Sequence, residues 1–300
     1  MKLNLQTNNQ SFVLFDAAMA ILALLGLALA SLGWWLGGAW LWLSYLMALC
    51  LVLLAYGIWI APKRLKTTHL REALSKSPQA WLKAVYIADL HAGSNKSEAW
   101  YKKLCSMIKE IDPELLLVGG DFSVCDASHL DKLQCLAKLD MRHGKYFVLG
   151  NHDYLDDPQI VKEQLSAWGF ESLTNETKMI SFQGLELQLA GLDETLYGAP
   201  KISKRITEKP LVALAHEPDA LLDLSEGQAD LVLCGHTHGG QIRFPLIGCL
   251  VVPSKLGRRV DMGRKVINGI PTFITRGLGE VLCRARLLCP PEIVVLELGI

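Results

Sequence analysis

The sequence predicts an α/β domain that follows an N-terminal transmembrane helical hairpin. Two observations carry this prediction. The first 60 residues hold only two charged side chains, Lys2 and Asp16, whereas the rest of the chain has the mixed composition of a globular protein. Beyond residue 80, short β-rich apolar runs alternate with segments of helical periodicity, a pattern typical of β-α-β units.

The N-terminal hairpin is predicted from the length of its uncharged stretch, which runs from Ala17 to Pro62. A single helix of that length would rise about 69 Å, more than twice the ~30 Å hydrocarbon core of a bilayer. Glycines and tryptophans cluster at its midpoint, as expected at a membrane interface. We therefore predict an anchor over residues 1–62 with spans at about 14–34 and 39–60. The alternative, a cleaved signal peptide, is disfavoured because the stretch is too long.

Flanking charge predicts the orientation of this anchor. Cations follow the second span at Lys63, Arg64 and Lys66, whereas the turn between the spans has none, so the positive-inside rule places both ends in the cytoplasm. The eight cysteines show no disulfide-like spacing, which suits a reducing compartment. Residues 63–80 read as a juxtamembrane linker or interfacial helix. The chain has 30 basic and 30 acidic residues, so no nucleic-acid binding is expected.

In the α/β part, polar residues directly follow five apolar runs. The runs are predicted strands at 84–88, 115–118, 146–149, 211–215 and 231–234, with helices at 97–110 and near 128–139. Ligands gather at the carboxyl ends of strands in open α/β sheets. Carboxylate, amide and imidazole groups without cysteine exclude a zinc finger and suit manganese, iron or zinc. The polar residues at the strand ends are Asp89, His91, Asp121, Asn151, His152, His216, His236 and His238.

In this order and spacing, these residues resemble the five-block signature of the calcineurin-like metallophosphoesterases. The resemblance implies a four-layer αββα sandwich over residues 81–300 that binds two divalent ions, with manganese favoured and iron or zinc as alternatives. It implies that Asp121 bridges the ions and that His152 faces the phosphate as general acid or electrostatic clamp. The implied ligands are Asp89, His91 and His238 for the first ion, and Asn151, His216 and His236 for the second.

Other residues have a functional and a structural interpretation. Asp153 is either a partner of His152 or a helix cap, and we favour the partner. Arg276, near the end of a predicted strand at 271–275, is a candidate substrate-binding residue or a structural one. The segment 278–289 mixes apolar residues with Arg284 and Arg286, so it forms either an amphipathic lip for an acyl chain or a loop over the core.

Details outside the five blocks resemble a bacterial branch of membrane-associated phosphoesterases, some of which hydrolyse UDP-2,3-diacylglucosamine. The motifs are Ala215-His216-Glu217-Pro218-Asp219, Gly239-Gly240-Gln241, Arg276-Gly277-Leu278-Gly279 and Pro290-Pro291-Glu292-Ile293. We predict a multi-pass protein of a bacterial inner membrane with a cytoplasmic catalytic domain, which cleaves a phosphodiester or pyrophosphate bond in a lipid-linked substrate. The alternatives are a tethered phosphodiesterase for soluble nucleotides and an inactive scaffold.

Overall fold

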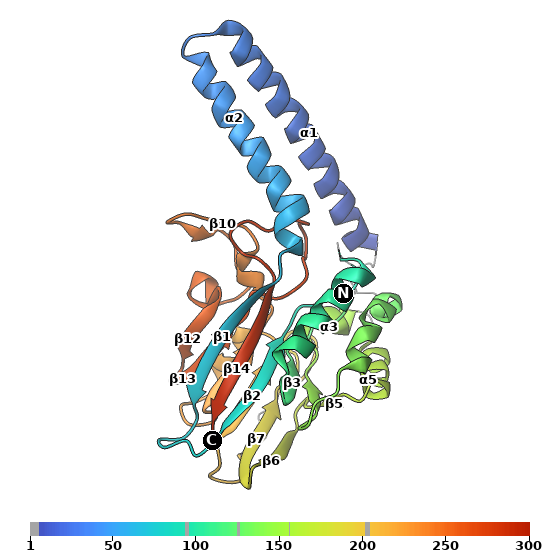
Figure 1. Cartoon of the computed structure of the whole chain (residues 1–300), viewed down its shortest axis with the longest axis vertical. Helices are drawn as coiled ribbons and strands as arrows, with labels where there is room; N and C mark the ends of the chain where they lie inside the picture. Colours follow the sequence, from blue (N-terminus) through green and yellow to red (C-terminus); the bar gives the residue numbers. More distant parts are fainter. Residues whose placement is uncertain (1–5, 94–95, 125–126, 156, 202–204) are drawn as a thin grey trace.

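Two long helices project from an α/β domain in the computed structural model, which describes residues 6–93, 96–124, 127–155, 157–201 and 205–300 (Figure 1). Helices α1 (Gln6–Leu36) and α2 (Trp40–Ala55) form a hairpin, and α2 continues through a π-helical turn, η1 (Tyr56–Ile60), and a 3₁₀ turn, η2 (Ala61–Lys63). The stretches Val13–Leu36 and Trp40–Lys63 are long and apolar enough to span a membrane. The predicted spans at 14–34 and 39–60 lie almost wholly within these helices.

Small residues let the two helices turn and approach each other. Gly37 and Gly38 form the turn with φ angles of 67° and 56°, a conformation that favours glycine. Near the turn, a Cβ on Gly33 would lie 2.5 Å from the Ser44 hydroxyl oxygen. That hydroxyl donates a hydrogen bond of 2.8 Å to the carbonyl of Ala30 on the other helix. Close backbone approach with a polar cross-link is typical of helix pairs in membranes.

The predicted linker over 63–80 is wrong for much of its length, because residues Lys66–Ala73 form strand β1. This strand pairs in parallel with β14 (Glu292–Gly299), from Lys66 opposite Glu292 to Ala73 opposite Gly299. Only Leu70 in β1 is buried, so the strand lacks the apolar alternation that would reveal it in the sequence. Its partner lies more than two hundred residues away, and local pattern carries no signal of such a pairing.

The α/β domain contains two six-stranded mixed sheets. The first has the order β1-β14-β2-β3-β4-β5, with β14 antiparallel to β2 and the remaining pairs parallel. The second has the order β12-β13-β9-β8-β7-β6, antiparallel at its two edges and parallel between them. Besides β14, the inner strands are β2 (Trp81–Ile87), β3 (Leu115–Val118), β4 (Lys145–Phe147), β7 (Leu185–Gly191), β8 (Leu211–Ala215), β9 (Leu231–Cys234) and β13 (Ile270–Ile274). Besides β1, the edge strands are β5 (Glu171–Ser172), β6 (Thr177–Phe182) and β12 (Gly263–Ile267). A separate two-stranded hairpin is formed by β10 (Arg243–Phe244) and β11 (Gly248–Cys249).

Alternation along each strand produces the layers. In β2, Ala84 and Tyr86 enter the core between the sheets, whereas Val85 and Ile87 pack against the helices outside the first sheet. Those helices are α3 (Glu98–Ile111), η3 (Ala127–Lys138), α4 (Asn151–Leu155) and α5 (Pro158–Ala167). The second sheet packs on its outer side against the short 3₁₀ helices η4 (Pro218–Asp223) and η6 (Gly257–Val260). The predicted sandwich is confirmed, with a thin fourth layer.

Candidate metal centre

The predicted site residues come together at the carboxyl ends of strands from both sheets. Backbone hydrogen bonds hold the neighbouring strand ends in register: Asp89 N donates to Gly120 O at 2.9 Å, and His91 N donates to Asp121 O at 3.0 Å. In the second sheet, Gly235 N donates to His216 O at 3.0 Å. Rigid strands of the two sheets thus present their terminal loops to one shared space.

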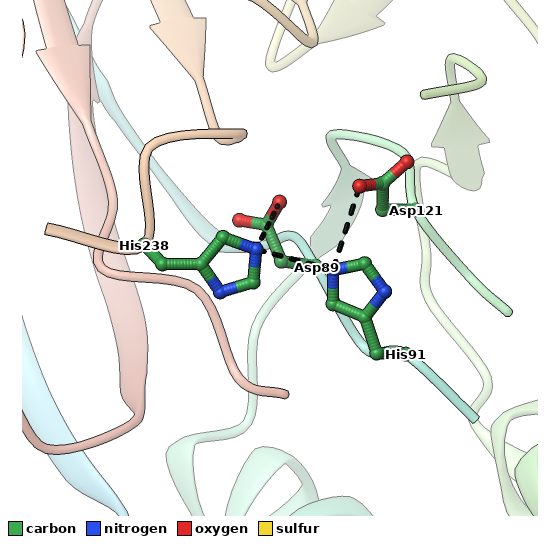
Figure 2. Close-up of side chains that lie close together, drawn as sticks. All are labelled: Asp89, His91, Asp121 and His238. Carbon is green, nitrogen blue, oxygen red and sulfur yellow. Dashed lines mark hydrogen bonds and ion pairs between the residues drawn. The ribbon is translucent and has the colours of Figure 1, made fainter. Parts of the chain in front are cut away.

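A first cluster consists of Asp89, His91, Asp121 and His238, all buried (Figure 2). The Nε2 atoms of His91 and His238 lie 3.1 Å apart, and their rings are stacked. His91 Nε2 is 3.4 Å from Asp121 Oδ2, and His238 Nε2 is 3.6 Å from Asp89 Oδ1. Two imidazole nitrogens and two carboxylates therefore converge from three loops, a suitable donor set for one divalent cation.

A second cluster shares Asp121 with the first. Asp121 Oδ2 lies 3.1 Å from His216 Nε2, so the same oxygen atom faces a histidine of each cluster. Asn151 Oδ1 is 2.9 Å from His236 Nδ1, and the His216 and His236 rings are 5.2 Å apart. The other Asp121 oxygen, Oδ1, accepts a hydrogen bond of 2.9 Å from His152 N, which orients the carboxylate. Asp121 therefore occupies the position that a bridging ligand needs.

The backbone at this site is strained. Five of the predicted ligands have φ angles in the left-handed region: Asp89 at 54°, His91 at 45°, Asp121 at 58°, His236 at 67° and His238 at 51°. This region disfavours residues other than glycine, and such conformations concentrate at functional sites. Glycines allow the loops to touch, since a Cβ on Gly150 would lie 2.2 Å from Asp121 Oδ1.

Burial keeps most of the imidazoles neutral. It lowers the pKa of His91 to about 3 and of His236 to about 4, so their ring nitrogens are free to act as metal donors. Burial also raises the pKa of Asp89 to about 7. His216 differs: burial alone would lower its pKa, but the Asp121 carboxylate and other acids raise it well above the usual value.

These buried groups fit divalent cations. Asp89 Oδ2 is fully buried and has no hydrogen-bond partner among the described residues, an arrangement that is costly unless a ligand completes it. A cation next to Asp121 would also neutralise the carboxylates that otherwise hold a proton on His216. The residues that line the two clusters are therefore suited to divalent metal ions.

His152 lies at the edge of the centre. Its ring meets that of His91 edge-on at 4.7 Å between centroids, and it lines the cavity that opens from the clusters. Burial lowers its pKa. Among the described residues it is not part of either donor cluster, and its predicted role beside the phosphate stays a prediction.

Asp153 acts on a different neighbour from the one favoured by sequence. Its carboxylate is fully buried and accepts four backbone N–H bonds: from Asp121 at 2.9 Å, Phe122 at 2.8 Å, Ser123 at 3.3 Å and Gly150 at 3.0 Å. It therefore fixes the loop that carries Asp121 to the loop that carries Asn151 and His152. These four bonds organise the loop that carries the Asp121 carboxylate.

Glu217 was not predicted as a site residue. It is buried, and one of its carboxylate oxygens lies within 4.8 Å of donor atoms of His216 and His236. Its Oε2 accepts a bond of 3.2 Å from Thr195 N. The sequence signal was its place directly after His216 at the end of β8, where an acidic residue adds charge to the second cluster.

Arg276 is engaged in a structural contact. Its Nη2 lies 2.5 Å from Glu292 Oε1 and 3.0 Å from the Thr68 hydroxyl, and its backbone N donates to Glu292 Oε2 at 3.0 Å. The arginine thereby links β13 to β14 and β1. These contacts support its structural interpretation over the substrate-binding one.

A cavity of about 650 Å³ opens from the metal centre. One end is lined by Asp121, Asn151, His152, His236 and His238. The rest is mainly apolar, and its walls come from Phe244 of the β10–β11 hairpin, from the residues on either side of the hairpin and from residues 281–283. The apolar wall residues include Ile242, Phe244, Leu250, Val251, Val281 and Leu282. The polar residues of the two clusters thus share one cavity with a mainly apolar wall, here called the apolar groove.

The chain is similar to known phosphoesterases. The family model for calcineurin-like phosphoesterases matches residues 82–240. Phosphodiesterase YaeI of Escherichia coli is 31% identical over 76% of this chain and 86% of its own length. An uncharacterized metallophosphoesterase of Bacillus subtilis, YkuE, is 29% identical over 81% of this chain and 88% of its own. A zebrafish (Danio rerio) transmembrane protein with a metallophosphoesterase domain is 31% identical over 65% of this chain and 49% of its own. The chain belongs to the calcineurin-like phosphoesterase family.

Proposed function

We propose that this protein is a membrane-anchored phosphoesterase with two divalent ions that hydrolyses a phosphodiester or pyrophosphate bond. The observation that carries the proposal is the pair of donor clusters that share Asp121 Oδ2. Asp89, His91 and His238 would hold one ion, and Asn151, His216 and His236 the other. Mixed oxygen and imidazole donors favour manganese, and iron or zinc would fit the same set.

The side chains have distinct tasks in this reaction. When bound, the two ions would polarise the phosphoryl group and provide a nucleophilic water at neutral pH. Asn151 contributes a neutral oxygen, which limits the repulsion of an anionic substrate. His152 lines the cavity beside the clusters, where it can bind a phosphoryl oxygen or donate a proton to the leaving group. Asp153 holds the Asp121 loop in place through its four backbone contacts.

We further propose a substrate that carries an apolar chain, such as UDP-2,3-diacylglucosamine. The apolar groove next to the metal centre supports this choice, because a soluble nucleotide would leave that wall without a partner. The two candidate membrane helices support it too, since an anchored enzyme meets membrane substrates at high local concentration. A tethered phosphodiesterase for soluble nucleotides is the second candidate, and an inactive scaffold would not need the full donor set.

For the topology, we propose a multi-pass protein of a bacterial inner membrane whose catalytic domain faces the cytoplasm. The exposed cations Lys63, Arg64 and Lys66 at the end of the second helix support this orientation. A reporter fused after Ile300 should then behave as cytoplasmic, and one inserted at Gly37 as external. The reverse pattern would place the site on the other side of the membrane.

The activity is tested with purified full-length protein, Mn²⁺, and a panel of soluble and lipid-linked phosphodiesters and pyrophosphates, with products identified by mass. Hydrolysis that requires the ion and disappears in Asp121→Ala is expected. Turnover of lipid-linked members above soluble ones supports the lipid substrate, and the reverse preference supports the nucleotide phosphodiesterase. If no member of the panel is hydrolysed in a metal-dependent way, the inactive scaffold is the remaining candidate.

A further inference from the structure

Two segments beside the metal centre expose large apolar side chains to an unusual extent. They are residues 244–251, which include most of the β10–β11 hairpin, and residues 281–288; together we call them the apolar rim. Leu246, at the tip of the hairpin, is fully exposed. Single exposed leucines are ordinary, but a gathered set marks an interaction surface. The exposed rim residues are Phe244, Leu246, Ile247, Leu250, Val251, Leu282 and Leu288.

Three leucines of the rim have backbone conformations that are unfavourable for leucine. Leu246, Leu282 and Leu288 have φ angles of 65°, 62° and 52°, where glycine or asparagine is the usual residue. Each is more than half exposed, so none gains burial within the chain that would offset the strain. A locally unfavourable residue that also exposes apolar surface is expected where a partner contacts it.

The rim is bonded to the helical hairpin. Arg286 N donates a hydrogen bond of 2.9 Å to the carbonyl of Gly57, which lies within the candidate span Trp40–Lys63. Arg284 Nη1 reaches Asp16 Oδ2 on α1 at 3.1 Å, near the start of the span Val13–Leu36. Residues 284–286 therefore lie level with the domain-side ends of both helices.

The β10–β11 hairpin continues this contact outward. Arg243 N donates to Leu287 O at 2.9 Å, and Ile242 forms a bridge with Leu287. Figure 1 shows β10 level with the lower end of α2, on the side of the domain that faces the helices. The helix ends, residues 284–288 and the hairpin thus form one continuous surface.

Charge next to the hairpin has the sign that a phospholipid surface attracts. The Arg258 guanidinium donates to the carbonyl of Ile247 in the hairpin turn. Arg258, Arg259 and Lys255 are exposed, as are Lys63 and Arg64 at the end of the second helix. Apolar side chains flanked by cations are typical of segments that lie in the interface of an anionic bilayer.

We propose that the apolar rim inserts into the leaflet next to the helical hairpin, and that the groove it walls takes the apolar chain of a lipid substrate directly from that leaflet. The rim supplies the wall of the groove: Phe244, Leu250, Val251 and Leu282 line the cavity that ends at His236 and His238. The occupant of this surface is therefore bilayer lipid. This inference rests on the proposed function for the site and on the two helices as spans.

Photo-crosslinking tests the membrane contact independently of catalysis. The full-length chain carries p-benzoylphenylalanine at position 246 and is reconstituted in vesicles of phosphatidylethanolamine and phosphatidylglycerol. A matched control places the same residue at position 206, where Ile206 is 59% exposed in a loop at the amino end of β8. Phospholipid adducts at 246 and not at 206 are expected. Adducts to a second copy of the chain, or no more lipid at 246 than at 206, would overturn the proposal.

A pair of model esters tests the groove. Wild type, Leu246→Ser and the control Ile206→Ser are compared on hexadecyl 4-nitrophenyl phosphate in vesicles and on ethyl 4-nitrophenyl phosphate in solution. Leu246→Ser should lose about tenfold in kcat/KM on the hexadecyl ester, the scale of one leucine removed from an apolar contact, and less than twofold on the ethyl ester. Ile206→Ser should match wild type on both.

The outcomes distinguish a failure of the rim proposal from a failure of the proposed function. Equal losses of Leu246→Ser on both esters, or none on the hexadecyl ester, overturn the role of the rim in lipid uptake. Turnover of the ethyl ester alone by wild type overturns the lipid groove but leaves the phosphoesterase intact. If wild type cleaves neither ester with Mn²⁺, the phosphodiesterase form of the proposed function fails, and the crosslinking at position 246 alone decides the membrane contact.

Discussion

Asp153→Asn should destabilise the fold and weaken metal binding, although Asp153 is not itself a candidate ligand. The carboxylate accepts four buried N–H bonds, two on each oxygen. Asparagine keeps one oxygen but turns an amide nitrogen toward the other two donors, which then have no acceptor. Each buried donor without a partner costs about 1–3 kcal/mol, so the variant should lose about 3 kcal/mol of unfolding free energy. Its Tm should fall by about 6–12 °C.

The same change should weaken metal binding, because the released loop carries Asp121. Loss of a group that positions a ligand typically lowers metal affinity about 10- to 100-fold. Mn²⁺ titration and thermal unfolding of the detergent-purified chain measure both effects. Asp157→Asn is the matched control: Asp157 Oδ1 caps α5 by accepting from Gln159 N at 2.9 Å, and asparagine caps a helix equally well. If Asp153→Asn behaves like Asp157→Asn in both assays, the positioning role is refuted.

Four further substitutions test the site and its surroundings. Asp121→Ala should abolish binding of both ions and Asn151→Ala mainly that of the second, measured as metal content per chain; two ions in Asp121→Ala would exclude a shared ligand. His152→Ala should keep its metals but lose about 10²–10⁴-fold in turnover, less with a nitrophenolate leaving group than with an alkoxide; loss of metal instead would make it a ligand. Arg286→Met should destabilise the fold by about 3–5 kcal/mol, because it leaves the buried Glu280 without one of its two cationic partners; an unchanged Tm would contradict this.

The site was predictable because its signals are local. Each candidate ligand directly follows an apolar run, and the predicted runs at 115–118, 211–215 and 231–234 coincide with β3, β8 and β9. Strand ends of one sheet meet at one edge, so sequence order was enough to group the residues of each sheet. That the two groups face each other follows from the packing of the two sheets. The helix at Glu98–Ile111 was predictable from an equally local signal, since Ser97 caps it by accepting a hydrogen bond from Trp100 N.

What sequence could not supply were contacts between distant segments. Arg286 looked like an exposed cation of a lip, but it is fully buried, bonded to Glu280 and to the carbonyls of Arg276, Gly279 and Cys289. The 278–289 segment has an anchored part and an exposed part: Glu280 and Arg286 hold it in the interior, while Leu282 and Leu288 remain exposed. Its role as a lip for an acyl chain stays a prediction. The amino-acid composition of the segment does not distinguish its buried residues from its exposed ones, whereas the fold does.

The junction between anchor and domain bears on the choice between the two substrate classes. Only Arg64 and Leu65 separate η2 from β1, and β1 is bonded along its whole length to β14. Residue 286 adds a link through Gly57, and Arg284 adds another through Asp16, so the domain is bonded to the helices at three places. A flexible tether would suffice to enrich a soluble nucleotide enzyme at the membrane. Attachment at several places would instead fix which face of the domain meets a bilayer spanned by the helices. The apolar walls of the cavity lie on that side, which favours the proposed substrate drawn from the membrane.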